Sequence, residues 1–251
     1  MTHNLIAVST WSVHHLLEKI PLEALPAELA ARGFGRVEIC HFHLASQETD
    51  YLRSIGKLFR DHSIVIQTLL IDDGDITNPT SRQRDLMWIE SWIESAAQLG
   101  AQNARVIAGK AAPSADILKS SVDGLKILAA LGVKLGVRVV TENWFSTLST
   151  PEAVHYVLDE VGNSLGFLVD TGNWNGPTKY TDLKSIFARA ELCHAKTSFA
   201  AGLKIDADDN AKWLQAAKAA NYKGPYTLIF ADEGNEWQGL AIERKYIEGA
   251  A

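Results

Sequence analysis

The chain contains few cysteines and no long apolar segment. Only two of its 251 residues are cysteine, Cys40 and Cys193, which excludes a disulfide-rich scaffold and is typical of a reducing compartment. Apolar runs stay short of the ~18 residues that a transmembrane helix needs, so no membrane partner is expected. The first residues also lack the basic and apolar segments of a signal peptide, and we therefore expect a cytoplasmic protein.

Positive charge is scarce as well. The sequence has 24 lysine and arginine residues against 30 aspartate and glutamate residues, a formal net charge of -6. Because proteins that bind nucleic acids generally carry a basic surface, no nucleic-acid partner is expected. The phosphate-binding glycine patterns of nucleotide-binding folds are also missing, since the stretch after the first apolar segment reads STWSVHH. This absence argues against an open doubly wound sheet.

Short apolar segments alternate with helical patterns along the whole chain. We expect strands over residues 5–9, 36–40, 64–71, 104–108, 137–142, 166–170, 191–195 and 226–230. Apolar spacing and terminal signals predict helices over 21–32, 81–99, 114–135 and 209–220, and another that begins at Thr150-Pro151. No Ser-, Pro- or Gly-rich linker divides these units. Eight strand–helix units over residues 1–251 predict a single-domain (β/α)8 TIM barrel of the α/β class.

Polar residues gather at one end of these predicted strands. The segments that end them read STWSVHH, EICHFH, LLIDDGD, ARVIAGK, VVTENW, FLVDTGNW, LCHAKTSF and LIFADEGNEW, whereas the opposite ends are plainer. In a TIM barrel, the active site lies where the strands end. This asymmetry predicts a functional site at that mouth.

Three of these ends supply residues of the kind that bind metals. Glu142, Asp170 and His194 end consecutive strands, and alternation places each on the side that fills the barrel. Two carboxylates and one imidazole suit a single Mn²⁺, Mg²⁺, Co²⁺ or Zn²⁺ ion. The alternative is that the three are unrelated capping or salt-bridge residues.

Further residues at the mouth are candidates for proton transfer and substrate contact. Lys196 lies two positions after His194 and should face the same mouth, as a base or as a fixed cation for a substrate oxygen or phosphate. The candidate substrate contacts are Trp11, His41, Asp72, Lys110, Asn143, Trp144 and Trp174. Several of these residues also have a structural alternative. Asp72 would form a turn, His41 would hydrogen-bond within the cavity wall, and each tryptophan would pack at the rim. Glu38, Arg105 and Arg138 lie within strands and are interpreted as a structural ion network.

The chain resembles the xylose-isomerase-like TIM-barrel superfamily of sugar (phosphate) isomerases and epimerases. The motifs that carry the resemblance are STWSVHH, TENW, VDTGNW, CHAKTSF and YKGPYTL. The resemblance implies one divalent metal held by Glu142, Asp170 and His194, with a ketose or polyol derivative bound over it. It also implies a pair of glutamates that moves a proton beside the substrate carbonyl.

The sequence departs from the family pattern at the eighth strand. The second glutamate of the family would fall near Ile229, and the nearest carboxylates are Asp232 and Glu233. Asp232 would complete the metal site if a bulge re-aimed it. If Asp232 does not take this role, one-base isomerisation, dehydration or retro-aldol cleavage is favoured over two-base epimerisation. We then expect Glu142 and Lys196 to carry the proton transfer.

These observations predict a metal-dependent isomerase or epimerase of a sugar or polyol. A homo-oligomer is compatible with this prediction. A dehydratase or lyase on a keto-polyol would use the same metal site. A metal-free sugar-binding barrel is a further alternative, kept open by Ile229. A DNA-repair endonuclease of the same superfamily is disfavoured, because the chain is acidic and lacks extra ligand-type residues.

Overall fold

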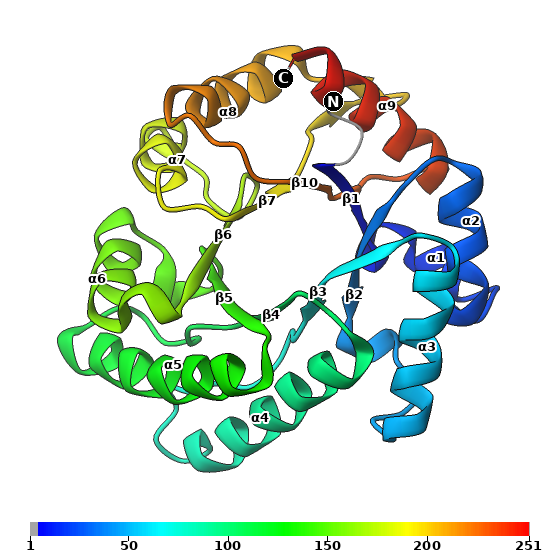
Figure 1. The fold of residues 1–251 in the computed structure, drawn as a ribbon. Helices are drawn as coiled ribbons and strands as arrows, with labels where there is room; N and C mark the ends of the chain where they lie inside the picture. The colour runs from blue at the N-terminus through cyan, green and yellow to red at the C-terminus, as the bar shows by residue number, and fades with distance from the viewer. Residues whose placement is uncertain (1–4, 251) are drawn as a thin grey trace.

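Eight parallel strands close into a barrel in the computed structural model, which describes residues 5–250 (Figure 1). They are β1 (Ile6–Ser9), β2 (Arg36–Cys40), β3 (Val65–Leu70), β4 (Asn103–Val106), β5 (Arg138–Glu142), β6 (Gly166–Asp170), β7 (Leu192–Ala195) and β10 (Tyr226–Leu228). Strand β10 closes the ring between β7 and β1. The structure confirms the predicted TIM barrel, with strand ends within one or two residues of the predicted ones. The predicted bounds 1–251 include residues outside the described part.

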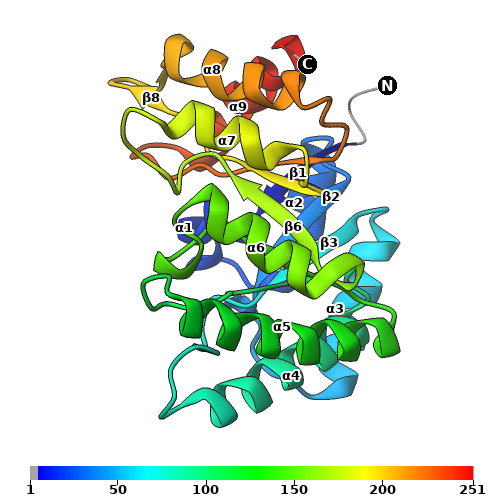
Figure 2. The same cartoon turned by 90° about the vertical axis from the view of Figure 1, so that its left-hand side faces the viewer.

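Helices surround this barrel and cover the outer face of its strands (Figure 1). They are α1 (His14–Leu17), α2 (Leu25–Ala31), α3 (Thr49–Asp61), α4 (Arg82–Leu99), α5 (Ala115–Leu135), α6 (Pro151–Val161), α7 (Lys179–Phe187), α8 (Ala207–Ala219) and α9 (Glu236–Ala250). Short 3-10 turns lie at Thr10–Val13, Leu22–Ala24, His41–His43, Ser146–Leu148 and Gly162–Ser164. Figure 2 shows α4, α5, α6 and α7 stacked in chain order along one side. Among residues 5–250, no helix combines the length and apolar character needed to cross a lipid bilayer.

Local signals in the sequence explain where several helices begin and end. The Thr150 side chain accepts a hydrogen bond from the backbone N–H of Ala153, and Pro151 occupies the first helical position of α6. Gly100 ends α4 in a left-handed conformation with φ of 79°. The predicted helix over 21–32 is divided into a 3-10 turn and α2, because Pro26 cannot donate a backbone hydrogen bond and favours a helix start.

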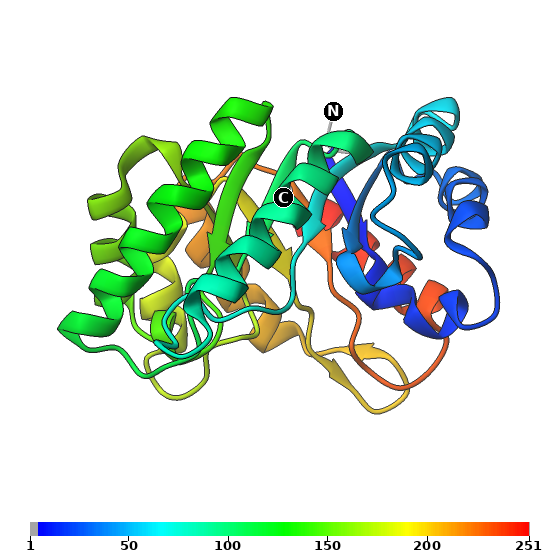
Figure 3. The same cartoon turned by 90° about the horizontal axis from the view of Figure 1, so that it is seen from below.

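The connection between β7 and α8 contains a feature that the sequence pattern did not predict. Strands β8 (Phe199–Ala200) and β9 (Lys204–Ile205) pair as a short antiparallel hairpin. Figure 3 shows this hairpin (gold) at the end of the barrel that carries the loops after the strands. Its strands are too short to give an alternating pattern, which accounts for the missed prediction.

Apolar residues fill two separate regions of the fold. The main core lies between strands and helices, and a small cluster of Val140, Leu168 and Leu192 is distinct from it. These three residues come two positions before Glu142, Asp170 and His194 on β5, β6 and β7. Since side chains two positions apart on a strand share a side, the cluster and the three polar residues form one column.

Candidate metal centre

A cavity of about 390 Å³ opens where the barrel strands end. The charged or ionisable residues of its lining include Asp72, Arg105, Glu142, Asp170, His194 and Lys196. Its aromatic and aliphatic residues include Trp11, Phe42, Trp144, Phe145 and Ile229. The cavity therefore combines convergent charged groups with apolar walls, which is typical of a small-molecule site.

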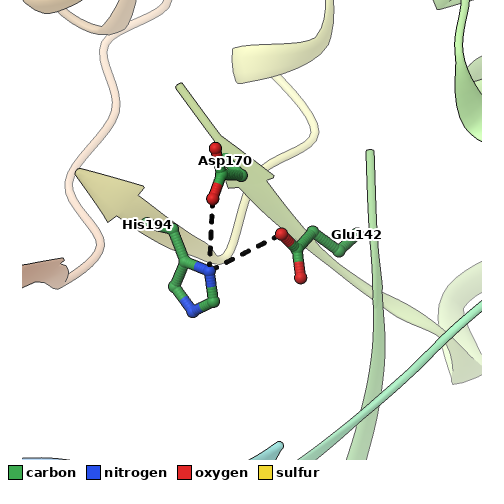
Figure 4. A group of neighbouring side chains, drawn as sticks. All are labelled: Glu142, Asp170 and His194. Atoms are coloured by element: carbon green, nitrogen blue, oxygen red, sulfur yellow. Dashed lines mark ion pairs between the residues drawn. The ribbon is translucent and has the colours of Figure 1, made fainter. Parts of the chain in front are cut away.

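Three buried side chains converge at the base of this cavity. Nδ1 of His194 lies 3.6 Å from Oε1 of Glu142 and 3.6 Å from Oδ2 of Asp170 (Figure 4). One ligand atom from each residue lies within 4.8 Å of the other two. Strand register produces this arrangement, since Asp170 pairs with His194 and Glu142 pairs with Leu168, two positions before Asp170.

The opposite nitrogen of His194 is held from inside the barrel. Nε2 of His194 lies 2.7 Å from Oε2 of Glu38, whose side chain is fully buried. Oε1 of Glu38 accepts hydrogen bonds from Thr68 Oγ1 at 2.8 Å and from Gln67 Nε2 at 3.0 Å. Although burial disfavours the charged ring, the carboxylates of Glu38 and Glu142 raise the His194 pKa well above its usual value.

Glu142 is oriented by two donors of different kinds. Nδ2 of Asn173 donates a hydrogen bond of 2.8 Å to Oε1 of Glu142. Nε of Arg105 lies 3.1 Å from Oε2, an ion pair in which the N–H is poorly aligned, so Oε2 lacks a hydrogen-bond donor among the described residues. Arg105 also pairs with Asp72, and its guanidinium lies 4.8 Å from the ring centre of Trp144.

Asp170 is fixed by backbone contacts on both sides. The Asn143 side chain accepts from the Asp170 N–H at 2.8 Å and donates to the Asp170 carbonyl at 3.0 Å. The Gly172 N–H donates to Oδ1 of Asp170 at 2.6 Å. These contacts leave Oδ2 facing His194, as a metal ligand requires.

Lys196 reaches the cavity beside these residues. Its side chain is half-buried, and a Cβ atom added to Gly172 would lie 2.4 Å from Cδ of Lys196. Gly172 therefore leaves the space in which the lysine stem lies. Across residues 5–250, the Lys196 ammonium has no hydrogen-bond or ion-pair partner, although its charge acts on the Asp232 carboxyl, and it is therefore available to a bound molecule.

The other predicted substrate contacts divide into two groups. Trp11, Asp72 and Trp144 line the cavity, whereas His41, Lys110, Asn143 and Trp174 do not. His41 accepts a hydrogen bond from the Asp72 N–H at 3.2 Å, so it holds the backbone of a residue that lines the cavity. Alternation along the strand turns Asn143 away from the mouth that Glu142 faces.

Two of the predicted contacts are held by partners outside the cavity. Lys110 pairs with Asp73 at 2.7 Å. Nε1 of Trp174 donates to the Leu148 carbonyl at 3.1 Å. Both side chains therefore serve the surrounding loops in this structure.

Asp232 does not join the metal-binding group. In the described chain, the group comprises Glu142, Asp170 and His194, while Asp232 is exposed and absent from the cavity lining. Strand β10 ends at Leu228, and the chain leaves the barrel before it reaches Asp232. Partial burial raises the pKa of the Asp232 carboxyl, and the Lys196 ammonium acts in the opposite direction.

Sequence reasoning missed the functional position of three residues. Glu38 and Arg105 were expected in a structural ion network, yet Glu38 contacts His194 and Arg105 lines the cavity beside Glu142. Asn173 follows β6 in the VDTGNW motif, and its contact with Glu142 is a loop contact that strand alternation does not predict. Arg138 fits the structural interpretation, because its Nε donates to Oε2 of Glu191 at 3.0 Å where β5 and β7 begin, at the end of the strands away from the cavity.

The three converging residues fit a divalent metal. Glu38 holds Nε2 of His194, and if this nitrogen carries the proton, Nδ1 presents a lone pair toward the two carboxylates. The donor set of two oxygens and one nitrogen suits Mg²⁺, Mn²⁺, Co²⁺ or Zn²⁺. Oε2 of Glu142 is ion-paired with Arg105 but accepts no hydrogen bond from the described residues, so it has a lone pair to offer a cation. A metal would thus be held by Glu142, Asp170 and His194.

Known proteins share this architecture. The family model described as xylose isomerase-like TIM barrel matches residues 26–249. None of the curated proteins matches the chain significantly. A structure of L-ribulose 3-epimerase aligns with a TM-score of 0.76 at 15% identity over 98% of this chain and 95% of that one. A xylose isomerase-like TIM barrel protein from Mycobacterium smegmatis, in complex with magnesium, gives 0.70 at 14% identity over 93% and 90%.

A fusion protein extends this set of similar structures. It combines a xylose isomerase-like TIM barrel with 4-hydroxyphenylpyruvate dioxygenase, and it aligns with a TM-score of 0.73 at 22% identity over 97% of this chain. This chain spans only 42% of the fusion protein. At these identities the structural matches establish the fold, and the family model covers most of the sequence. The chain therefore belongs to the xylose isomerase-like TIM barrel family.

Proposed function

We propose that the protein is a divalent-metal-dependent isomerase or epimerase that acts on a sugar or polyol derivative. The observation that carries this proposal is the convergence of Glu142, Asp170 and Nδ1 of His194 at the base of the cavity. The similar structures include L-ribulose 3-epimerase and a magnesium complex, which supports both the substrate class and the metal.

The proposed chemistry is proton transfer beside a carbonyl group. When bound, the metal would act as a Lewis acid that polarises the substrate carbonyl. Glu142 takes the proton from the neighbouring carbon, since its carboxylate is held at the cavity base by Asn173. Lys196 gives a proton to the carbonyl oxygen, because its ammonium group is otherwise unpaired in the described chain.

The walls of the cavity suit a molecule of the size and character of a monosaccharide. Its volume of about 390 Å³ lies within the range of small-molecule sites. Trp11, Trp144 and Phe145 offer apolar faces that can pack against the C–H groups of a sugar. Arg105 and Asn173 lie beside the same base and offer donors for hydroxyl oxygens.

A screen of sugars with the metal-loaded protein tests this proposal. Protein loaded with Mn²⁺ is incubated with free and phosphorylated pentoses and hexoses, and the products are identified by NMR. We expect metal-dependent conversion of at least one of them, and we expect Glu142→Gln to abolish it. Asp232→Asn serves as the control and should retain both the metal and the activity. Conversion that persists after complete removal of metal would contradict the proposal.

A further inference from the structure

The cavity carries its ionisable side chains on one side. From Asp72 after β3 to Lys196 after β7, neighbouring strands contribute Asp72, Arg105, Glu142, Asp170, His194 and Lys196. The remaining arc, formed by β10, β1, β2 and the residues that follow them, contributes Ile229, Ser9, Trp11, Cys40 and Phe42. Burial raises the pKa of the Cys40 thiol to about 12, so it stays protonated at neutral pH. This second arc has no group that exchanges protons readily.

Ile229 occupies the position next to the metal-binding group around the ring. Thr227, two residues earlier, faces the barrel interior, where its Oγ1 accepts a hydrogen bond of 3.0 Å from Gln67. Alternation therefore turns Ile229 to the same side, and it lines the cavity with only 5% of its surface exposed. Its N–H donates to the Ala195 carbonyl at 3.3 Å, which places it beside the residue that follows His194.

No carboxylate of the following loop replaces this apolar side chain. Asp232 and Glu233 are both exposed, and neither lines the cavity. Glu142, Asp170, His194 and Ile229 therefore lie on four neighbouring strands around the barrel. The first three side chains can bind a metal, and the fourth is a hydrocarbon that cannot.

We propose that Ile229 determines the reaction outcome by restricting proton exchange to one face of the substrate. This inference rests on the proposed function. Glu142 removes a proton from the hydroxyl-bearing carbon, the C–H electrons form the double bond of an enediol, and the carbonyl oxygen takes a proton from Lys196. Glu142 then returns the proton to the former carbonyl carbon on the same face, while the first hydroxyl loses its proton to Lys196. Inversion of a carbon would require a second acid on the other face, and Ile229 supplies none from the part of the cavity that it lines.

The inference predicts isomerisation between a ketose and an aldose without inversion of a stereocentre. All atoms and electrons are conserved in this step, so no oxidant or reductant is needed. The structure is thus similar to that of L-ribulose 3-epimerase, while the distribution of its acids and bases differs from what two-face exchange requires.

Metal binding by Ile229 variants tests the position of this residue without any substrate. Calorimetric titration with Mn²⁺ compares the wild type, Ile229→Glu and the similarly sized but uncharged Ile229→Gln. A carboxylate at this position adds a ligand, so Ile229→Glu should bind Mn²⁺ at least ~10-fold more tightly than Ile229→Gln. Equal affinities would overturn the inference, whereas a wild type that binds no Mn²⁺ would refute the proposed function itself.

Proton exchange in deuterated water tests the stereochemical consequence with the wild type alone. Mn²⁺-loaded protein is incubated with D-ribulose, D-xylulose, D-fructose and D-tagatose, and the products are followed by NMR. We expect no product inverted at C3 from any of the four, and aldose products should carry deuterium at C2 wherever solvent exchange occurs. A 3-epimer formed by the wild type would overturn the inference even if the metal data agree.

Discussion

Oε2 of Glu38 lies 2.7 Å from Nε2 of His194, and this contact links the barrel interior to the cavity base. Glu38 belongs to β2 and His194 to β7, so the pair spans the barrel. The carboxylate orients the ring so that Nδ1 faces Glu142 and Asp170. Glu38 is thus a positioning residue, which acts on a bound metal through His194.

Replacing the Glu38 carboxylate should weaken metal binding. Glu38→Gln retains the size of the side chain but removes the charge that holds the imidazole, so Mn²⁺ affinity should fall by about 10–100-fold. Titration calorimetry measures this change, and circular dichroism verifies the fold. The matched control is Glu243→Gln, another fully buried glutamate that lies outside the cavity lining. Unchanged Mn²⁺ affinity in Glu38→Gln would remove Glu38 from the account.

Loss of the Lys196 ammonium should affect turnover but not metal content. Lys196→Met keeps a stem of similar length, and kcat should fall by at least about 10²-fold because a general acid is lost. Metal content, measured by mass spectrometry, should match that of the wild type. Near-normal turnover in this variant would exclude Lys196 from proton transfer. The same loss of turnover in Asp232→Asn would transfer the role to the loop after β10.

A methyl group at residue 172 should disturb Lys196 indirectly. In Gly172→Ala the new Cβ would lie 2.4 Å from Cδ of Lys196, so the flexible lysine stem must shift. We expect kcat to fall by about 10-fold, less than in Lys196→Met, because the ammonium is displaced but retained. The N–H that donates to Oδ1 of Asp170 remains, and Mn²⁺ affinity should therefore stay within about 3-fold of the wild type. Wild-type turnover would show that the stem position is unimportant.

Glu243 on α9 provides a prediction for stability against pH. The side chain is fully buried, and both carboxylate oxygens lack a partner in the described chain. Burial raises the Glu243 pKa well above its usual value, and the nearby Asp232 acts in the same direction. The folded state therefore retains a proton that the unfolded chain releases above about pH 4.5. The protonated Glu243 side chain therefore contributes fully to the free energy of unfolding below about pH 4.5. This contribution is lost as the pH rises toward the raised pKa of Glu243 in the folded state.

Glu243→Gln should remove the decrease in stability that the wild type shows as the pH rises, because glutamine stays neutral at every pH. The difference in Tm between the variant and the wild type should grow from pH 5 to pH 8. At pH 8 it should correspond to ~1–3 kcal/mol, the usual cost of a buried unsatisfied polar group, with about 2–4 °C for each kcal/mol. Glu160→Gln, on the exposed face of α6, is the control and should show no such trend. A constant difference across this pH range would contradict the assignment of a buried, unpaired carboxyl.

The barrel was predictable because its signals are local and repeated. Each strand is a short apolar segment, and signals such as Thr150 with Pro151 mark where helices begin. The grouping of Glu142, Asp170 and His194 could also be anticipated, since these residues lie in the last two positions of consecutive strands and share their side with Val140, Leu168 and Leu192. Strand order and alternation are sufficient for this level of detail.

Contacts across the barrel and between loops could not be predicted in the same way. The pairing of Glu38 with His194 depends on side chains that meet in the interior from non-neighbouring strands. The orientation of Trp174 depends on the Leu148 carbonyl, a contact between two loops. The direction of Asn143 was readable, because it directly follows Glu142 on the strand and must face the other side.

Anomalous diffraction from crystals grown with Mn²⁺ shows whether Glu142, Asp170 and His194 bind a metal ion. We expect one strong peak at the cavity base, about 2.0–2.3 Å from a carboxylate oxygen of Glu142, a carboxylate oxygen of Asp170 and Nδ1 of His194. Asp170→Asn crystals grown in the same way should show a much weaker peak there. A fully bound Mn²⁺ ion found elsewhere, with no peak among these three side chains, would contradict the account.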